Sequence, residues 1–249
     1  MPEIPSPNFD QRPAGRGIDM LVLHYTGMKT ARAALARMCD PAAQVSAHYL
    51  IDEDGTTTAL VAEQNRAWHA GRAWWWGESD INGCSIGIEL VNPGHEFGYR
   101  DFPQDQMAAL EELAARIMAR HAIPPERVLG HSDVAPGRRQ DPGERFDWQR
   151  LAAAGMGLWP GAAGSVELSP LGPGDSGIEV VRLQTALGRY GWRIDPSGVF
   201  NNQTETVVRA FQRHFRPGLI DGRVDAESWG LLDALLALLG PSPPTQEAS

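Results

Sequence analysis

The chain has 249 residues, of which 42% are hydrophobic, and its formal net charge is −9. This composition is typical of a folded globular protein with room for one good core and a second small one. The acidic balance argues against nucleic acid as a partner, because phosphates attract a basic surface. No apolar run approaches the roughly 20 residues of a membrane-spanning helix, and we expect a monomer.

The N-terminal residues 1–17 carry prolines and charges where a secretory signal needs an apolar core. This pattern predicts a cytoplasmic protein, and the alternative is a periplasmic protein from which a signal has been removed. The two cysteines, Cys39 and Cys84, lie far apart and form no close motif. We interpret both as buried thiols rather than as a disulfide or a zinc cage, with a nucleophilic Cys84 as the alternative.

The first predicted strand is the apolar run 20–23, which places His24 at its end. Residues 30–38 are rich in alanine and leucine and predict a short helix. The β-prone segments SAHYLID and TTTALV flank an Asp-Gly turn, which predicts a hairpin. His48 lies inside that hairpin, and we interpret it as a packed or hydrogen-bonded histidine rather than a ligand.

The next segment, NRAWHAGRAWWWGES, is rich in glycine and tryptophan and predicts a loop. Its indoles can cover an edge of the core or form the wall of a site for sugar or peptide. The sequence leaves both roles open for Trp68, Trp74, Trp75 and Trp76.

The segment SIGIELVN predicts an inner strand and places Glu89 among isoleucine, leucine and valine. A carboxylate in such a strand is costly unless it has a partner or a chemical role. Glu89 is therefore either a partnered structural residue or, beside a metal and its water, a general base. Residues 104–121 repeat apolar side chains at helical spacing and predict an amphipathic helix, and the VLG that follows predicts one more short strand.

The stretch GHSDVAPGRRQDPG, residues 130–143, places charged and imidazole groups between prolines and glycines, which predicts a loop rather than a helix. Loops on a rigid scaffold are where catalytic groups concentrate. His131 and Asp141 are ordinary ligands of a divalent metal, and a catalytic zinc takes three protein ligands and keeps one position open. His24, at its strand end, is the best candidate for the third ligand.

Together, His24 in LVLHYTG, Glu89 in SIGIELVN, and His131 with Asp141 in GHSDVAPGRRQDPG resemble the motifs of a known enzyme family. The family is that of the zinc-dependent N-acetylmuramoyl-L-alanine amidases of the AmpD/AmiD type, and the match runs from about residue 20 to about residue 148. We expect an α/β fold in which helices flank a mixed central sheet. The resemblance implies hydrolysis of the amide between N-acetylmuramic acid, or its 1,6-anhydro form, and the L-alanine of peptidoglycan stem peptides.

The resemblance also implies roles for individual residues. It makes His24, His131 and Asp141 the ligands of Zn²⁺, and it gives Glu89 the proton transfers. It places His69, in the WHAG segment, beside the zinc pocket as a substrate contact. Such enzymes commonly carry lysine two residues before the last ligand, where this chain has Arg139. We expect the Arg139 guanidinium to face the oxyanion, because it stays protonated and cannot act as a general acid.

Composition changes after residue 159, where glycine, proline and serine become frequent. We predict an amidase domain over residues 1–160, a linker over 161–170, a small three-helix domain over 171–240 and a disordered tail over 241–249. The Leu183-Gln184 and Phe211-Gln212 pairs and the repeated glycines resemble the peptidoglycan-binding-domain-1 family. That resemblance implies binding to glycan or stem peptide, and the alternative is a helical cap that only stabilises the amidase.

Two other functions remain open for this chain. One is a non-catalytic peptidoglycan-binding or sensing protein, although such relatives typically lose a zinc ligand and all three are present here. The other is a zinc peptidase that cuts within the stem peptide, which uses the same groups and differs in the shape of its pocket. The expected partners are peptidoglycan fragments or muropeptides, in cytoplasmic recycling or in periplasmic trimming of intact wall.

Overall fold

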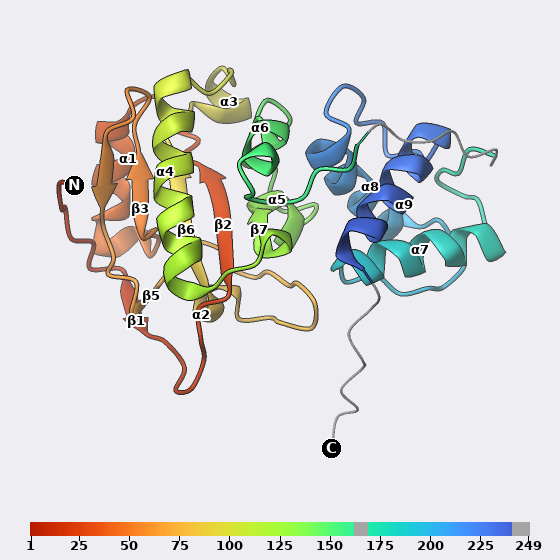
Figure 1. The fold of residues 1–249 in the computed structure, drawn as a ribbon, viewed down its shortest axis with the longest axis horizontal. Coiled ribbons are helices and arrows are strands. Elements are labelled where there is room, and N and C mark those ends of the chain that lie inside the picture. The colour runs from red at the N-terminus through yellow and green to blue at the C-terminus, as the bar shows by residue number, and fades with distance from the viewer. Residues whose placement is uncertain (162–168, 241–249) are drawn as a thin grey trace.

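The computed structural model describes residues 1–161 and 169–240, and the predicted tail and most of the predicted linker lie outside these ranges. Its centre is a five-stranded sheet in the order β4-β3-β6-β2-β7 (Figure 1). The strands are β2 (Met20–Tyr25), β3 (Tyr49–Ile51), β4 (Thr57–Ala59), β6 (Ser85–Leu90) and β7 (Val128–Gly130). All neighbours are parallel except the predicted hairpin β3–β4, which is antiparallel. The expected mixed sheet is therefore confirmed.

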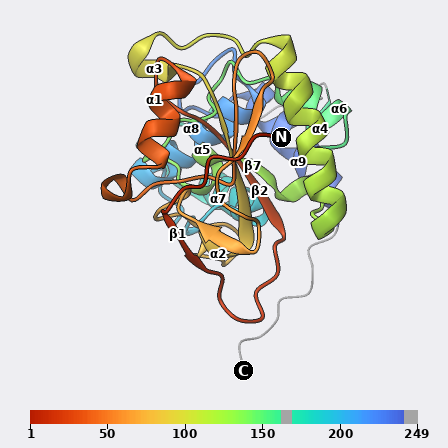
Figure 2. The ribbon, with the colours of Figure 1, turned by 90° about the vertical axis from the view of Figure 1, so that its left-hand side faces the viewer.

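The two central strands are buried on both faces, which explains why they are almost continuously apolar. Leu21 and Leu23 of β2 point into a core that they share with the 18-residue helix α4 (Gln104–His121). Met20 and Val22 point into a second core on the opposite face. Figure 2 shows α4 on one side of the strands and α1 (Ala31–Met38) on the other. Strand alternation thus divides one apolar run between two helix-covered faces.

The remaining short elements surround this sheet. A two-stranded antiparallel sheet joins β1 (Phe9–Gln11) to β5 (Asn65–Ala67). The other helical turns are α2 (Ile81–Cys84), α3 (Gly94–Phe97), α6 (Trp148–Ala153), η1 (Pro41–Ala43) and η2 (Pro125–Arg127). No helix among the described residues is long and apolar enough to cross a membrane.

The ligand-bearing stretch 130–143 corrects one prediction. After Gly130, four residues form a helical turn, α5 (His131–Val134), instead of an irregular loop. Asp133 makes the turn possible, because its Oδ2 accepts a hydrogen bond of 2.7 Å from the backbone N–H of Gly130 and so satisfies a free donor at the start of the turn. The loop that the prolines and glycines predicted is found only in the part of the stretch after Val134.

Three helices form the C-terminal module, as expected: α7 (Ile178–Tyr190), α8 (Asn202–Phe215) and α9 (Ala226–Leu239). They pack against the amidase part through a common core. Trp75, with no exposed surface, lies 5.4 Å from the rings of both Tyr190 and Trp192, measured between centroids. The apolar core on the Met20 face of the sheet therefore continues into the helical module.

Candidate metal centre and active site

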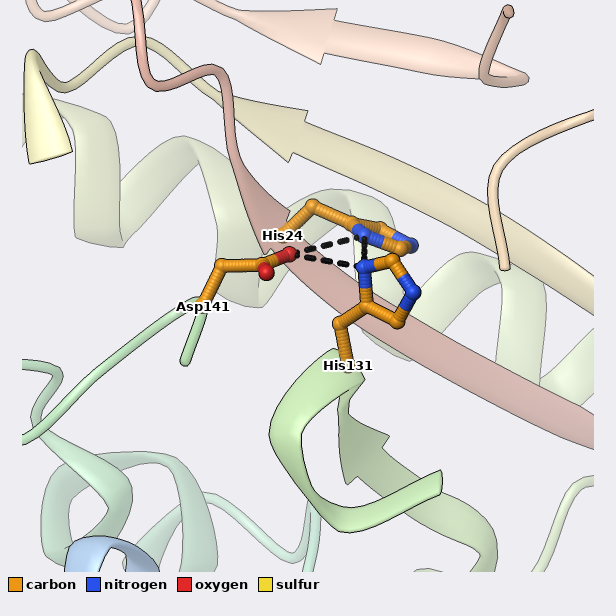
Figure 3. A group of neighbouring side chains, drawn as sticks. All are labelled: His24, His131 and Asp141. Atoms are coloured by element: carbon orange, nitrogen blue, oxygen red, sulfur yellow. Dashed lines mark hydrogen bonds and ion pairs between the residues drawn. The ribbon is translucent and has the colours of Figure 1, made fainter. Parts of the chain in front are cut away.

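Three side chains converge at the carboxyl end of β2. The Nδ1 atoms of His24 and His131 are 2.9 Å apart, and each lies 3.0 Å from Oδ2 of Asp141 (Figure 3). His24 is the last residue but one of β2, and His131 begins α5 directly after the neighbouring strand β7. Asp141 is brought back to His131 by a hydrogen bond of 2.8 Å from the backbone N–H of Ser132 to the Asp141 carbonyl. The structure thus brings together the three residues that the sequence predicted as ligands.

Hydrogen bonds on the far side of each imidazole decide which nitrogen faces this centre. The Ser85 hydroxyl donates to the carbonyl of Ile81, so its oxygen is free to accept from Nε2–H of His69 at 3.2 Å. Nδ1 of His69 then accepts from Nε2–H of His24 at 3.1 Å. This series of hydrogen bonds leaves Nδ1 of His24 unprotonated, with a free lone pair.

His131 is oriented in the same way. Its Nε2–H donates to the carbonyl oxygen of Ala70 at 3.0 Å, which also leaves Nδ1 without a proton. Metal-binding histidines usually donate their second ring nitrogen to such a partner. Both imidazoles therefore direct a lone pair at Asp141.

The charges of the three groups fit a cation between them. Burial lowers the pKa of His24 to about 4, so this imidazole stays neutral. Burial acts to raise the pKa of Asp141, but positive charge and hydrogen bonds at the positions of His131 and His24 lower it well below its usual range. With both imidazoles neutral, a bound cation would supply that charge. Two lone pairs and a carboxylate oxygen at 2.9–3.0 Å repel one another unless a positive ion lies among them. Two imidazoles and one carboxylate are a ligand set typical of catalytic metal sites.

Glu89 stands beside this centre because of strand register. In the parallel pair β2–β6, His24 is directly opposite Glu89. Burial, and after it the charge of Asp141, raises the pKa of Glu89 well above its usual value. Its buried Oε2 has no hydrogen-bond partner among the described residues. The alternative of a partnered structural glutamate is not supported, and a carboxyl group with a raised pKa in a cleft has the properties of a general base.

An open cleft of about 690 Å³ lies over these groups. His24, His131, Asp141 and Glu89 all line it, and the backbone after β6, from Pro93 to Phe97, forms part of its rim. No tryptophan lines the part of this cleft that the structure describes. Instead, Trp75 and Trp76 lie at the junction with the helical module, where Nε1 of Trp76 donates to the carbonyl of Arg189 at 3.1 Å. For these two indoles the structure favours covering the core over forming the wall of a site.

The two adjacent arginines of the 130–143 stretch have different surroundings. Arg138 donates from Nη2 to the carbonyl of Arg72 at 2.8 Å and also bonds the carbonyl of Ala70, so it fixes the WHAG segment to the stretch. Arg139 is exposed in the cleft and has no ion-pair partner within residues 1–161 and 169–240. Its charge acts on Glu89, whose pKa it lowers against the effect of burial. The free guanidinium of Arg139 is thus available to a substrate.

Other predicted residues have clear places. His69 lines the cleft, and its Nδ1 supports His24, so its role as a substrate contact stays a prediction. His48 is buried and accepts a hydrogen bond of 2.9 Å from the backbone N–H of Gly87, which confirms its structural interpretation. Burial raises the pKa of the Cys84 thiol to about 11, which argues against a nucleophile. Cys39 is half-buried, and both thiols are free.

Sequence reasoning missed a polar group on the rim. The Tyr25 hydroxyl is 2.9 Å from Nδ1 of His95, and Nε2 of His95 is 3.1 Å from both carboxylate oxygens of Glu144. Tyr25 and His95 line the cleft. The only local signal was the position of Tyr25 next to His24 at a strand end, because His95, on α3, and Glu144 are both distant from it in sequence.

A mixed sheet that carries a His–His–Asp group able to hold a metal ion, with a buried carboxylate oxygen in the same open cleft, is typical of metal-dependent hydrolases. Residues 14–144 match the family model described as N-acetylmuramoyl-L-alanine amidase, and residues 176–232 match that of a peptidoglycan binding domain. The chain belongs to the N-acetylmuramoyl-L-alanine amidase family, in which this activity is the shared one.

Curated relatives and solved structures agree with this assignment. N-acetylmuramoyl-L-alanine amidase AmiD of Escherichia coli (strain K12) is 38% identical over 90% of this chain and 84% of its own length. The 1,6-anhydro-N-acetylmuramyl-L-alanine amidase AmpD of Haemophilus influenzae is 34% identical over 61% of this chain and 90% of its own. Among structures, the E. coli AmiD complex with anhydro-N-acetylmuramic acid-L-Ala-D-gamma-Glu-L-Lys has a TM-score of 0.78 over 92% of this chain and 93% of that one. AmpDh3 of Pseudomonas aeruginosa, 32% identical, has a TM-score of 0.77 over 93% and 96%.

Proposed function

We propose that this protein hydrolyses the amide between the lactyl group of N-acetylmuramic acid and the L-alanine of a peptidoglycan stem peptide, with Zn²⁺ held by His24, His131 and Asp141. The observation that carries the proposal is the convergence of three unprotonated ligand atoms beside Glu89 in one cleft. The similar AmiD and AmpDh3 proteins have been solved with muropeptides, which supports a substrate of that class.

The mechanism follows from the surroundings of each residue. When bound, zinc supplies a Lewis acid that polarises the amide carbonyl and lowers the pKa of water to about 7. Glu89 accepts a proton from the attacking water, whose oxygen forms the new bond to the carbonyl carbon. Glu89 then returns that proton to the alanine nitrogen as the C–N bond breaks. The pKa of Glu89, raised well above its usual value by burial, suits the first step, because it makes the carboxylate a stronger proton acceptor.

Arg139 assists by charge alone. Its guanidinium, exposed in the cleft, faces the negative charge that develops on the carbonyl oxygen. It cannot donate a proton at any working pH. For this reason Glu89 carries both proton transfers in the proposed mechanism.

The proposal also assigns a role to each part of the chain. Residues 1–160 form the catalytic domain, residues 161–170 the connection, and residues 171–240 a module that binds peptidoglycan. The match of residues 176–232 to a peptidoglycan binding domain supports the last assignment. Recycling of anhydro-muropeptides belongs in the cytoplasm, and trimming of intact wall belongs in the periplasm, so substrate preference bears on the compartment.

A parallel digest tests this function. Zinc-loaded protein is incubated with soluble 1,6-anhydro-muropeptide and with intact sacculi, and the products are identified by mass spectrometry, with Glu89→Gln as the matched variant. We expect free stem peptide beginning at L-alanine, and a loss of about 10²–10⁴-fold in rate for Glu89→Gln with zinc content unchanged. Cleavage within the stem peptide would indicate a peptidase instead, and no cleavage of either substrate would indicate a binding protein.

The two substrates also separate the two tasks. Release from the soluble muropeptide alone would support a recycling amidase in the cytoplasm. Release from sacculi as well would support a wall-acting enzyme whose C-terminal module delivers it to the polymer.

A further inference from the structure

Helix α8 of the C-terminal module lies directly against the ligand-bearing stretch of the amidase. In Figure 1, α8 faces α5 across the junction of the two parts. Residues of α8 that contact this stretch include Thr206, Arg213 and His214. Arg213 and His214 follow Thr206 by seven and eight positions, which is about two helical turns, so the three side chains lie on one face of the helix.

Each of these side chains reaches a different point of residues 130–144. Thr206 lies against Gly137, where a Cβ atom would be 2.8 Å from Thr206 Cγ2. Nε of Arg213 is 3.8 Å from Oε2 of Glu144. Nδ1 of His214 is 2.8 Å from Oδ2 of Asp133. The helix therefore supports the stretch at two points between its two candidate ligands, Asp133 and Gly137, and at one point after them, Glu144.

The His214–Asp133 contact is the most enclosed of the three. The two side chains are 1% and 0% exposed, and the imidazole stacks on the ring of Trp148 at 3.8 Å between centroids. Nδ1–H of His214 donates to the same Oδ2 atom that accepts the Gly130 backbone N–H. One carboxylate oxygen thus joins α8 to the first turn of α5, the turn that begins with His131.

Without His214, this carboxylate would lose its one side-chain donor within residues 1–161 and 169–240. A buried carboxylate that lacks a donor is costly, and the turn relieves that cost by shifting toward water or toward another donor. Because Asp133 is two residues from His131 and closes the turn that carries it, such a shift moves a metal ligand.

We propose that His214 is a positioning residue of the amidase: through Asp133, α8 holds His131 and Asp141 in place for the metal. The inference rests on the proposed function and extends it, because it gives the helical module a part in the chemistry in addition to any contact with the wall. Outer partners of metal ligands typically change metal affinity 10- to 100-fold, which sets the size of the expected effect.

Two substitutions at one position separate hydrogen bonding from packing. His214→Phe keeps a flat ring against Trp148 but removes the donor. His214→Asn loses the stacking but restores an N–H close to the position of Nδ1. Gln203→Ala is the matched control, since Gln203 is exposed on the same helix. Zinc affinity is measured by competition with a chromogenic chelator, and kcat and KM are measured with soluble muropeptide, which is too small to require binding to the polymer.

We expect His214→Phe to bind zinc 10- to 100-fold more weakly and to lose kcat with KM nearly unchanged. His214→Asn should recover most of both losses, and Gln203→Ala should match the wild type. Wild-type zinc affinity and kcat in His214→Phe would overturn the inference, even if the melting temperature fell, because a purely structural residue would give that result.

A second variant keeps the test decisive if His214→Phe does not fold. Thr206 is half-buried against Gly137, so Thr206→Leu presses on the stretch without removing a buried polar group. Weakened zinc binding in this folded variant supports the inference, and unchanged binding contradicts it. If the wild type cleaves no muropeptide, the proposed function fails, while the zinc titrations still decide whether α8 positions the ligands.

Discussion

Arg138 and Arg139 show how neighbouring residues of one type acquire different tasks. Arg138 donates hydrogen bonds to the carbonyls of Ala70 and Arg72 and so fixes the position of the loop that carries His69. Arg139 points into the cleft, where its charge acts on Glu89 and His24. Both arginines line the cleft, and they differ because only Arg138 has the backbone carbonyls of Ala70 and Arg72 within reach.

We predict that Arg139→Ala lowers kcat about 100-fold with little change in KM, because the guanidinium stabilises charge that develops only in the transition state. Arg139→Lys should retain most of the rate, since an ammonium at the same place supplies the same charge. Steady-state kinetics on soluble muropeptide check this, with Arg32→Ala on the exposed side of α1 as the control. A change in KM alone would mean that Arg139 binds the ground state.

Glu63 gives a prediction about pH and stability. Its carboxylate accepts from Arg120, His121 and the Tyr49 hydroxyl at 2.5–2.6 Å. Burial acts to raise the pKa of Glu63, but these donors outweigh it and lower the pKa to about 2. The unfolded value is about 4.3. A depressed folded pKa gives stability that is present above the unfolded pKa and is lost as pH falls through the folded one.

Glu63→Gln should therefore lower the free energy of unfolding at pH 7, and its difference from the wild type should shrink as pH falls from about 4.3 toward 2. Urea unfolding at pH 7 and pH 3 measures the two differences. Glu112→Gln is the control, because its pair with Arg116 is exposed and contributes little. Equal differences at both pH values would show that the Glu63 charge is not the cause.

At the scale of elements, the parallel pairing of β2 with β6 builds the site. It sets His24 opposite Glu89, and a slip of one residue would turn one of the two to the other face of the sheet. Strand β6 also carries Gly87, which has no Cβ atom and so leaves room for the His69 ring. A Cβ atom there would lie 2.4 Å from Cγ of His69.

Gly87→Ala should consequently displace His69, break its hydrogen bond to His24 and weaken zinc binding, with a 10- to 100-fold loss expected for a partner of a ligand. Chelator competition measures the affinity, and circular dichroism verifies that the sheet is retained. Gly161→Ala is a suitable control, because a Cβ atom there meets nothing within 4 Å among residues 1–161 and 169–240. Unchanged affinity in a folded Gly87→Ala protein would show that His69 does not orient His24.

At the scale of the whole molecule, the helical module is packed on the amidase through apolar side chains. Trp75 carries much of this junction, since it contacts Tyr190 and Trp192 edge to face and is fully buried. Gly191 allows the approach, because a Cβ atom there would lie 2.4 Å from the Trp75 ring. A shared core of this kind favours unfolding of the two parts together.

We predict a single unfolding transition for the full chain and a loss of about 3–5 kcal/mol for Trp75→Ala, the usual cost of truncating a buried aromatic residue. Trp76→Ala should cost much less, because Trp76 is 37% exposed. Urea titrations followed by far-ultraviolet circular dichroism measure both. Two separate transitions in the wild type would contradict the prediction and indicate that the modules unfold independently.

Several features of this protein could be predicted from local sequence. Apolar runs and helical spacing predicted β2, β6, α1, α4 and the C-terminal helices, because these patterns reflect which faces must be buried. The candidate ligands and Glu89 could also be predicted, since imidazole and carboxylate groups at strand ends and in a Gly- and Pro-rich stretch suit a metal site. The turn α5 was missed, because it depends on a cap supplied by Asp133.

The sequence by itself determined the family and identified the candidate ligands and the candidate general base, because side-chain type and motif spacing carry that chemistry. Only the tertiary structure decided which arginine keeps its donors free, which histidine nitrogens are unprotonated and where Trp75 and Trp76 lie. It alone joined His214 to Asp133 across 81 residues of chain. These features depend on contacts between distant segments, and such contacts exist only once the sheet, the 130–144 stretch and the helical module have packed together.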